Sequence, residues 1–330
     1  MAQYGFRLFL LRLHEGFKPA AVDVSKAGDK RDTHYAEVLK DLVKPQLNIV
    51  LDGRPILIDT DDGHDLKLSP GAELSCRWER AKRSGTHVSL SLRYGRQGDY
   101  DLALNTAEEA KLEDKATTRP YRVELFLPPA GDLGVLAVET VGRTHPTEMF
   151  TRWSGLLSRR ASRSKAKGGV LPPWWRIKVD PYPDPAQLDQ LIANGSKVRL
   201  QVTKYLPTAS GAGRSKQLVL VEHVHSQTLL KKATDKVKEW TSHPDADGAS
   251  DVASLMTPGT VGGMGFTDGE VVIEDEGGRE KRLSPGKMDE IFVYPFPGLH
   301  GERPKAGAWR AEVETKVKAL AKEHKLQLDW

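Results

Sequence analysis

The sequence predicts an α+β protein, with two mixed α/β domains joined by a basic linker. Short runs of alternating apolar and polar residues predict half-exposed strands, as where Val88, Leu90 and Leu92 alternate with serines. Asp-Gly pairs at 52–53 and 62–63 are typical of hairpin turns. Between such runs, apolar residues recur at helical spacing, so strands and helices are both expected along one chain.

Size and composition fit a folded protein of this class. The chain has 330 residues, of which 38% are hydrophobic and 28% charged, enough for a core in two domains or one large one. The single cysteine, Cys76, forms neither an internal disulfide nor a sulfur-based metal site, which favours a reducing, cytoplasmic location. The apolar run 6–13 is interrupted by two arginines and is too short to span a bilayer. Any membrane role is therefore expected to come through a partner.

The first domain is predicted over residues 1–157 and is rich in strands. Its first strand is the run 6–13, and a helix over 35–43 follows, with apolar residues at helical spacing. Further strands are predicted over 47–51, 55–59, 87–94, 100–104, 121–127 and 134–141. A helix is predicted from about Pro146, with an apolar face formed by Phe150, Trp153, Leu156 and Leu157.

A basic linker, residues 158–170, and a second domain, residues 171–330, are predicted next. The linker is polar and lacks apolar periodicity. In the second domain, strands are predicted over 174–179, 197–205, 217–224, 271–274 and 291–294, and helices over 185–193, 229–240 and about 306–324. Residues 242–268 are rich in Gly, Ser, Asp, Thr and Pro and are predicted to form a long loop with little structure.

Positive charge is concentrated in the middle of the chain. The net charge is only +4, but residues 152–238 hold 17 Lys/Arg against 5 Asp/Glu, so the rest of the chain is net negative. Such asymmetry favours a polyanionic ligand. Cations that neutralise phosphates release counterions, which gives tight, salt-sensitive binding without sequence preference. The sequence contains no helix-turn-helix pair, zinc finger or aromatic RNA-binding signature, so base-specific readout is not expected.

We therefore predict a non-enzymatic protein that binds double-stranded DNA through its backbone, with no cofactor, no metal site and no catalytic residue. The predicted DNA-binding residues are the basic side chains of this segment: Arg152, Arg159, Arg160, Arg163, Lys165, Lys167, Arg176, Lys178, Lys197, Arg199, Lys204, Arg214, Lys216, Lys231, Lys232, Lys236 and Lys238. They come from the linker, from strands and from one helix. The prediction requires them to share one surface.

Other residues leave alternative functions open. A metal-dependent nuclease effector would use Asp180, Asp184 and Lys178, or the pair His223 and His225, as its site. An adaptor would instead bring the basic segment to an acidic protein partner or to an anionic membrane surface.

Two further motifs are assigned to loops. The acidic run 59–65 lacks the spacing of an EF-hand and has Pro70 where the closing glutamate would stand, so a solvated hairpin tip is expected. The run 211–216 lacks the full spacing of a phosphate-binding loop, so a hairpin loop tipped by Arg214 and Lys216 is expected.

The order of the predicted elements resembles that of the RexA proteins of temperate phages. The resemblance is carried by a strand opening with Gly5-Phe6, a small helix and hairpins, a strand ending at 125–127 (LFL), the run 141–150 (VGRTHPTEMF) before a helix, and 177–179 (IKV) before a proline-bearing segment and a helix. It extends over most of the chain and includes no catalytic motif. This chain departs from the family by the longer stretch 242–268 and an extended C-terminal helix.

The resemblance implies a role in the exclusion of superinfecting phage. RexA-like proteins have two mixed α/β domains, form dimers, bind DNA without sequence specificity and distantly resemble the recombination-associated protein RdgC. They act with RexB, a membrane protein. The resemblance thus implies a homodimeric DNA-binding sensor that does not itself insert into a membrane and that signals to a RexB-like membrane protein.

Overall fold

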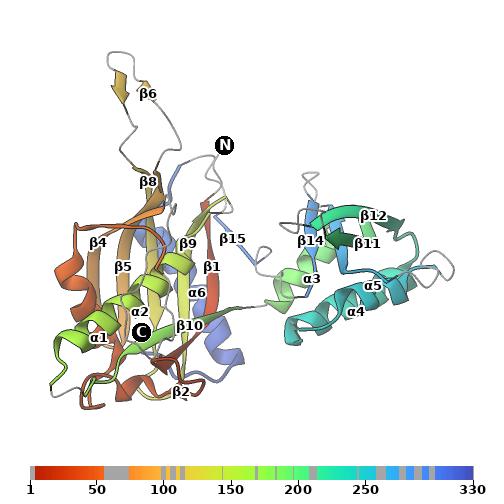
Figure 1. Cartoon of the computed structure of the whole chain (residues 1–330). Helices are drawn as coiled ribbons and strands as arrows, with labels where there is room; N and C mark the ends of the chain where they lie inside the picture. The colour runs from red at the N-terminus through yellow and green to blue at the C-terminus, as the bar shows by residue number, and fades with distance from the viewer. Residues whose placement is uncertain are drawn as a thin grey trace. The chain divides into compact units, whose positions relative to one another are not determined.

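The chain divides into two compact units (Figure 1). Unit 1 consists of Met1–Asp180 and Val293–Trp330, and unit 2 consists of Pro181–Phe292, so the second unit is an insertion into the first. The computed structural model describes residues 4–55, 74–97, 102–104, 109–111, 116–142, 144–167, 170–182, 184–195, 197–207, 214–243, 245–257, 265–274, 280–285, 292–296 and 302–329.

Unit 1 is built on a nine-stranded sheet. Its main path runs β10-β1-β9-β8-β5-β4-β3, and β2 and β15 also pair with β1. From β1 to β3 along this path, neighbouring strands are antiparallel. The strands are β1 (Tyr4–Glu15), β2 (Ala21–Val22), β3 (Val50–Asp52), β4 (Leu74–Ser84), β5 (His87–Gln97), β8 (Ala116–Phe126), β9 (Leu133–Val141), β10 (Trp175–Pro181) and β15 (Tyr294–Pro295), and a separate hairpin pairs β6 (Leu102–Leu104) with β7 (Glu109–Lys111).

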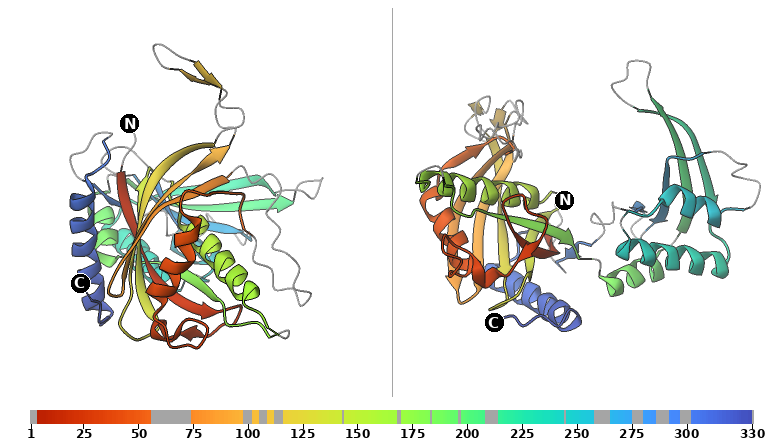
Figure 2. Two further views of the ribbon diagram at one scale, coloured as in Figure 1. Left: turned by 90° about the vertical axis from the view of Figure 1, so that its left-hand side faces the viewer. Right: turned by 60° about the horizontal axis from the view of Figure 1, so that its bottom comes forward.

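Helices cover both faces of this sheet (Figure 2). On one face lie α1 (Tyr35–Val43) and α2 (Thr147–Ser164), with the short 3-10 helices η1 (Val24–Lys26) and η2 (Lys44–Gln46) next to α1, and on the other face lies α6 (Ala306–Glu323). The core under α1 and α2 contains Trp78 and Trp153 together with alternate residues of β1, β5, β8 and β9. Under α6, Trp309 lies edge-on against Phe6, with 6.3 Å between the ring centroids.

Unit 2 is a four-stranded antiparallel sheet whose helices pack on one face. The strand order is β12-β11-β13-β14. Its elements are α3 (Pro185–Ala193), β11 (Lys197–Pro207), β12 (Arg214–His223), α4 (Gln227–Ser242), α5 (Gly248–Leu255), β13 (Asp268–Glu274) and β14 (Glu280–Leu283). Val198, Leu200 and Val202 of β11 are buried with Val237 and Trp240 of α4, because alternate residues of a strand face the same side.

The α+β class predicted from the sequence is confirmed. Both α1 and α3 have the predicted bounds, because each starts at a capping side chain followed by apolar residues at helical spacing. His34 caps α1 by accepting from Ala36 N, and Asp184 caps α3 by accepting from Ala186 N. Several other predicted strands and helices are present with shifted ends, whereas β4 and β14, which are rich in charged residues, were not expected. The predicted strand 55–59 lies almost wholly outside the described residues.

The boundaries between the two parts differ from the predicted ones. The predicted linker, 158–170, begins inside α2, because Ser158 and Ser162 are buried and bond the segment that leads into β10. The division instead falls between Asp180 and Pro181, and the chain returns to unit 1 at Val293. The C-terminal helix, predicted as part of a domain over 171–330, is therefore α6 of unit 1.

The predicted long loop over 242–268 contains a helix, α5, so that prediction is corrected. Asp247 caps α5 by accepting from the backbone N–H groups of residues 249 and 250, each at 3.1 Å, and Val252 packs into the core of unit 2. Gly248 and Gly269 contact each other through their backbones, and a Cβ on Gly269 would overlap Gly248 O. The glycines here allow close packing between α5 and β13, whereas their abundance in the sequence suggested a loop.

Candidate nucleic-acid interface

Seven of the predicted basic residues of unit 1 lie on the second half of α2, on the segment after it or on β10. Ser158 Oγ accepts a hydrogen bond from Trp175 N at 2.8 Å, and Ser162 Oγ donates one to Pro172 O. These two bonds tie the helix to the beginning of β10, which is an end strand of the sheet. We call the surface formed by Arg159, Arg160, Arg163, Lys165, Lys167, Arg176 and Lys178 the α2–β10 basic edge.

Two aromatic rings hold two arginines of this edge together. Phe17 packs edge-on against Trp174, with 5.1 Å between the ring centroids. The guanidinium of Arg159 lies 5.6 Å from the Phe17 centroid and 5.4 Å from the Trp174 centroid. The guanidinium of Arg176 lies 5.3 Å from the Phe17 centroid. Cation–π contacts orient guanidinium groups, so the two arginines are held beside Phe17.

The charge of this edge affects a neighbouring histidine. His14 is buried on β1, the strand beside β10. Burial lowers the pKa of His14, and the positive charges of Lys178 and Arg176 lower it further. The imidazole is therefore neutral near pH 7, and the positive field comes from the lysine and arginine side chains.

Three residues of the edge present unpaired charge to solvent. Arg160, Lys167 and Lys178 are exposed, and no carboxylate pairs with them in the part of the chain that the structure describes. Lys165 is also exposed, but its ammonium lies 2.7 Å from a carboxylate oxygen of Asp29. Because both side chains of that pair are about half exposed, water screens the pair and its cation can exchange the carboxylate for another anion.

Ion pairs neutralise six of the seventeen predicted DNA-binding residues. The pairs are Arg152 with Glu148, Lys165 with Asp29, Lys197 with Glu274, Arg199 with Glu280, Lys236 with Glu239 and Asp251, and Lys238 with Asp189. All of these carboxylates except that of Asp189 lie outside residues 152–238. The excess of positive charge counted along that segment is therefore larger than the charge the segment presents in the fold.

The predicted residues are also divided between the two units. Lys231 and Lys232 are exposed on α4 of unit 2, and Lys204 is half-buried on β11. Arg214 and Lys216 lie on β12, but their side chains are outside the described residues. Within unit 1, the structure brings Arg159 and Arg176 together through Phe17.

The residues of the alternative nuclease site have other contacts. Asp180 pairs with Arg12 at 2.9 Å, and Asp184 caps α3 in the other unit. His223 and His225 are exposed, and their rings stack with 6.1 Å between centroids. Within the described ranges, no group of three or more His, Cys, Asp or Glu side chains is placed to hold a metal ion.

The two motifs assigned to loops fall largely outside the described residues. The acidic run 59–65 lies wholly outside them, as do residues 211–213, whereas Arg214 and Lys216, predicted at the tip of a hairpin loop, lie on β12. The ladder between β11 and β12 ends with Pro207 opposite Arg214, so residues 208–213 connect the two strands of an antiparallel hairpin.

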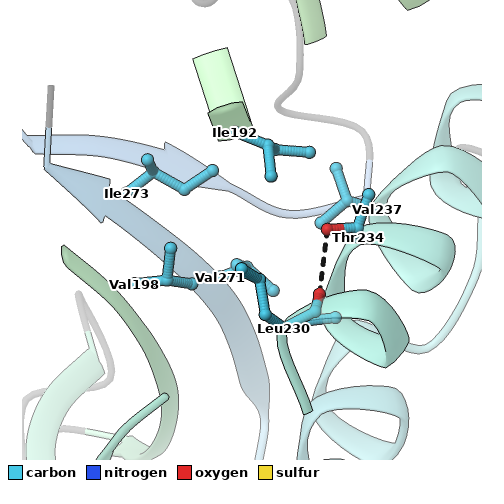
Figure 3. A pocket seen from close by; sticks show the side chains of 8 residues that line it. Ile192, Val198, Leu230, Thr234, Val237, Val271 and Ile273 are labelled. Atoms are coloured by element: carbon cyan, nitrogen blue, oxygen red, sulfur yellow. Dashed lines mark hydrogen bonds between the residues drawn. The ribbon is translucent and has the colours of Figure 1, made fainter. Parts of the chain in front are cut away.

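Unit 2 contains a small apolar pocket between α3, α4 and the sheet (Figure 3). Its cavity volume is only about 10 Å³, whereas ligand pockets measure roughly 300–1,000 Å³. Its lining includes Ile192, Val198 and Val237, and the hydroxyl of Thr234 already donates to Leu230 O at 2.9 Å. We therefore regard the pocket as a packing gap in the core.

Phe17 and Trp174 were not among the residues predicted from the sequence. Phe17 follows β1 and lies more than 140 positions from the arginines that it contacts. The one sequence signal is the run 174–178 (WWRIK), in which aromatic and basic residues are adjacent.

Comparison with known proteins gives no relative for this chain. No protein-family model, no curated protein and no solved structure matches it. In the described parts of the chain, no helix is both long and apolar enough to cross a membrane.

Proposed function

We propose that this chain binds double-stranded DNA without sequence preference, and that the α2–β10 basic edge of unit 1 is its main phosphate-binding surface. The observation that supports this most strongly is the gathering of Arg159 and Arg176 around Phe17, beside exposed Arg160, Lys167 and Lys178. Cations from α2, from the segment after it and from β10 thus lie at an end strand of the sheet. Several exposed cations in one part of a domain suit the negative charge of a DNA backbone.

The chemistry of this edge favours phosphate contacts over base contacts. A lysine ammonium is a compact point charge that binds phosphate without reading a base. An arginine reads guanine through the planar fork of its guanidinium. Arg159 is buried and lies over two aromatic rings, and Arg176 lies over one, so both contribute mainly fixed positive charge.

The biological setting of this proposal comes from the resemblance to RexA-like proteins. It places the chain in the cytoplasm as a homodimeric sensor of phage exclusion, which signals to a RexB-like membrane protein. DNA binding by the α2–β10 basic edge is argued from the residues of this chain and does not depend on that setting.

Charge reversal of the three exposed cations tests the proposal. The triple variant Arg160→Glu, Lys167→Glu, Lys178→Glu leaves Arg159, Arg176 and their aromatic contacts in place. Fluorescence anisotropy on several unrelated duplexes should show binding weakened by roughly 100-fold, at about 1 kcal/mol or slightly more for each lost contact, and equally for every sequence.

A matched control separates this surface from net charge. Lys82, Lys322 and Lys325 are exposed cations on other parts of unit 1, and their reversal to Glu changes the net charge by the same amount. This control should bind DNA much more tightly than the first variant. Equal affinity of the two variants, or unchanged affinity of the first, would contradict the proposal.

A further inference from the structure

Two exposed aliphatic side chains project beside the α2–β10 basic edge. Val170 is 73% exposed and Leu171 is 46% exposed, in the segment between α2 and β10. Burying a valine or leucine side chain is worth about 10–150-fold in an equilibrium. Exposed aliphatic side chains are common on protein surfaces, but these two adjoin exposed cations, which suggests a ligand that contacts both kinds of residue.

The base of this tip is held in place. Val170 N donates to Lys167 O at 3.2 Å, and Ser162 Oγ bonds Pro172 O. Pro172 and the proline after it have fixed φ angles. Apolar side chains on a segment anchored in this way lose less conformational entropy on binding than side chains on a free segment.

The ligand is expected to be anionic, because cations surround the tip. Lys165 and Lys167 are exposed immediately before it, and Arg160 is exposed one helical turn further back. An apolar wedge flanked by Lys and Arg is the arrangement with which many proteins enter the minor groove and unstack a base step. The tip is continuous with the edge that we assign to phosphates, which favours DNA over other anionic partners.

We propose that Val170 and Leu171 form a wedge that inserts between base pairs and kinks the duplex. This inference rests on the proposed function, since the basic edge must first hold the DNA. Its consequence is a preference for a class of DNA rather than a sequence: duplexes in which a base step is already unstacked or easily opened. A mismatch lowers the work of unstacking, and the wedge gains that difference as affinity.

Matched and mismatched duplexes of the same length test the wedge. The wild-type chain should bind a duplex with a central mismatch about tenfold more tightly than its matched counterpart. It should also raise the fluorescence of 2-aminopurine placed next to the mismatch, because that fluorescence increases when the base unstacks. The double variant Val170→Ser, Leu171→Ser should lose the preference and the fluorescence change together.

The chain offers a control with the same change in composition. Ile49 and Val50 are 48% and 56% exposed in another part of unit 1, and Ile49→Ser, Val50→Ser also removes two exposed aliphatic side chains. This control should keep both the preference and the fluorescence change. Loss of the preference in the control as well would overturn the assignment to Val170 and Leu171.

The outcomes distinguish failure of the wedge from failure of the proposed function. Equal binding of matched and mismatched duplexes by the wild-type chain overturns the wedge but leaves phosphate binding standing. Absence of binding to either duplex overturns both. Binding to phosphatidylserine vesicles that depends on Val170 and Leu171, without a mismatch preference, would assign the tip to a membrane surface and also overturn the wedge.

Discussion

At the scale of single residues, unit 1 places a carboxylate in full burial and surrounds it with cations. Glu139 has no exposed surface, and it accepts hydrogen bonds from the side chains of Arg122 and Arg303 and from the backbone N–H of Arg122, at 2.6–3.1 Å. Arg122 also donates to Pro304 O at 2.8 Å. The cluster thus joins β8 and β9 to the segment that leads into α6.

Neutralising that carboxylate should destabilise unit 1 strongly. Glu139→Gln keeps the shape of the side chain but leaves two guanidinium groups without their counter-charge, which should cost roughly 3 kcal/mol. Glu314→Gln on α6 removes an exposed i,i+4 pair with Arg310 and should cost about 0.5 kcal/mol or less. Urea denaturation of the two variants gives the comparison, and similar losses in both would contradict the role assigned to Glu139.

A second residue-scale feature concerns acid stability. Burial and, next, the positive charge of the neighbouring Arg7 lower the pKa of His145 to about 4. Its Nε2 lies 3.0 Å from Arg7 Nη1 and its Nδ1 lies 2.8 Å from Thr147 Oγ1, which fits a neutral ring that accepts from the arginine and donates to the threonine. Because the unfolded state binds the proton first, stability is full above about pH 6.5 and falls as the pH drops toward 4.

This pH dependence should be measurable by urea unfolding. The free energy of unfolding should fall by about 2 kcal/mol between about pH 7.5 and about pH 5 because of His145. Over that range the imidazole binds a proton in the unfolded state, where its pKa is ordinary, but stays neutral in the folded state. His145→Gln should reduce the pH dependence by that amount, whereas His243→Gln, at an exposed position, should change it little. A wild-type pH dependence that persists in His145→Gln would show that another group is responsible.

At the scale of elements, local signals in the sequence were sufficient for some helices and insufficient for others. Both α1 and α3 could be predicted because a cap and an apolar stripe lie within one short segment. The end of α2 could not, because Ser158 and Ser162 are buried by contacts with the segment before β10, and such contacts leave no periodic pattern in the sequence. The aromatic contacts of Arg159 and Arg176 could not be predicted either, because their partner Phe17 is distant from them in the sequence.

The helix α5 depends on its cap more than the longer helices do. It has only eight residues, and Asp247 satisfies two of its first backbone N–H groups. Asp247→Ala should therefore destabilise unit 2 by about 1 kcal/mol. Hydrogen exchange should become faster over Gly248–Leu255 and stay unchanged in α1. Unchanged exchange in α5 would mean that packing of Val252 alone maintains the helix.

At the scale of the whole molecule, unit 2 begins and ends next to one strand of unit 1. β10 and β15 both pair with β1, with Asp180 bonded to Arg12 and Tyr294 opposite Phe6. Six residues of a strand span about 20 Å, so the two ends of the insertion are within reach of a short connection. The sequence could not show this, because residues 180 and 294 both come to lie beside β1 only in the fold.

Unit 1 is accordingly expected to fold without unit 2. A chain in which residues 181–292 are replaced by a Gly/Ser linker of about 12 residues should unfold cooperatively. It should also keep Trp309 of α6 buried against the sheet. Circular dichroism and tryptophan fluorescence during thermal unfolding would test this. A shortened chain without a cooperative transition would show that unit 2 is required for the fold of unit 1.

The salt dependence of DNA binding tests the central claim, the assignment of the α2–β10 basic edge to DNA phosphates, most directly. Each phosphate contact contributes about 0.9 to the slope of log K against log salt concentration. Reversing Arg160, Lys167 and Lys178 should therefore reduce the steepness of that slope by about 3 relative to the wild-type chain, while the Lys82, Lys322 and Lys325 variant keeps the wild-type slope. Equal slopes for the wild-type chain and the first variant would contradict the assignment.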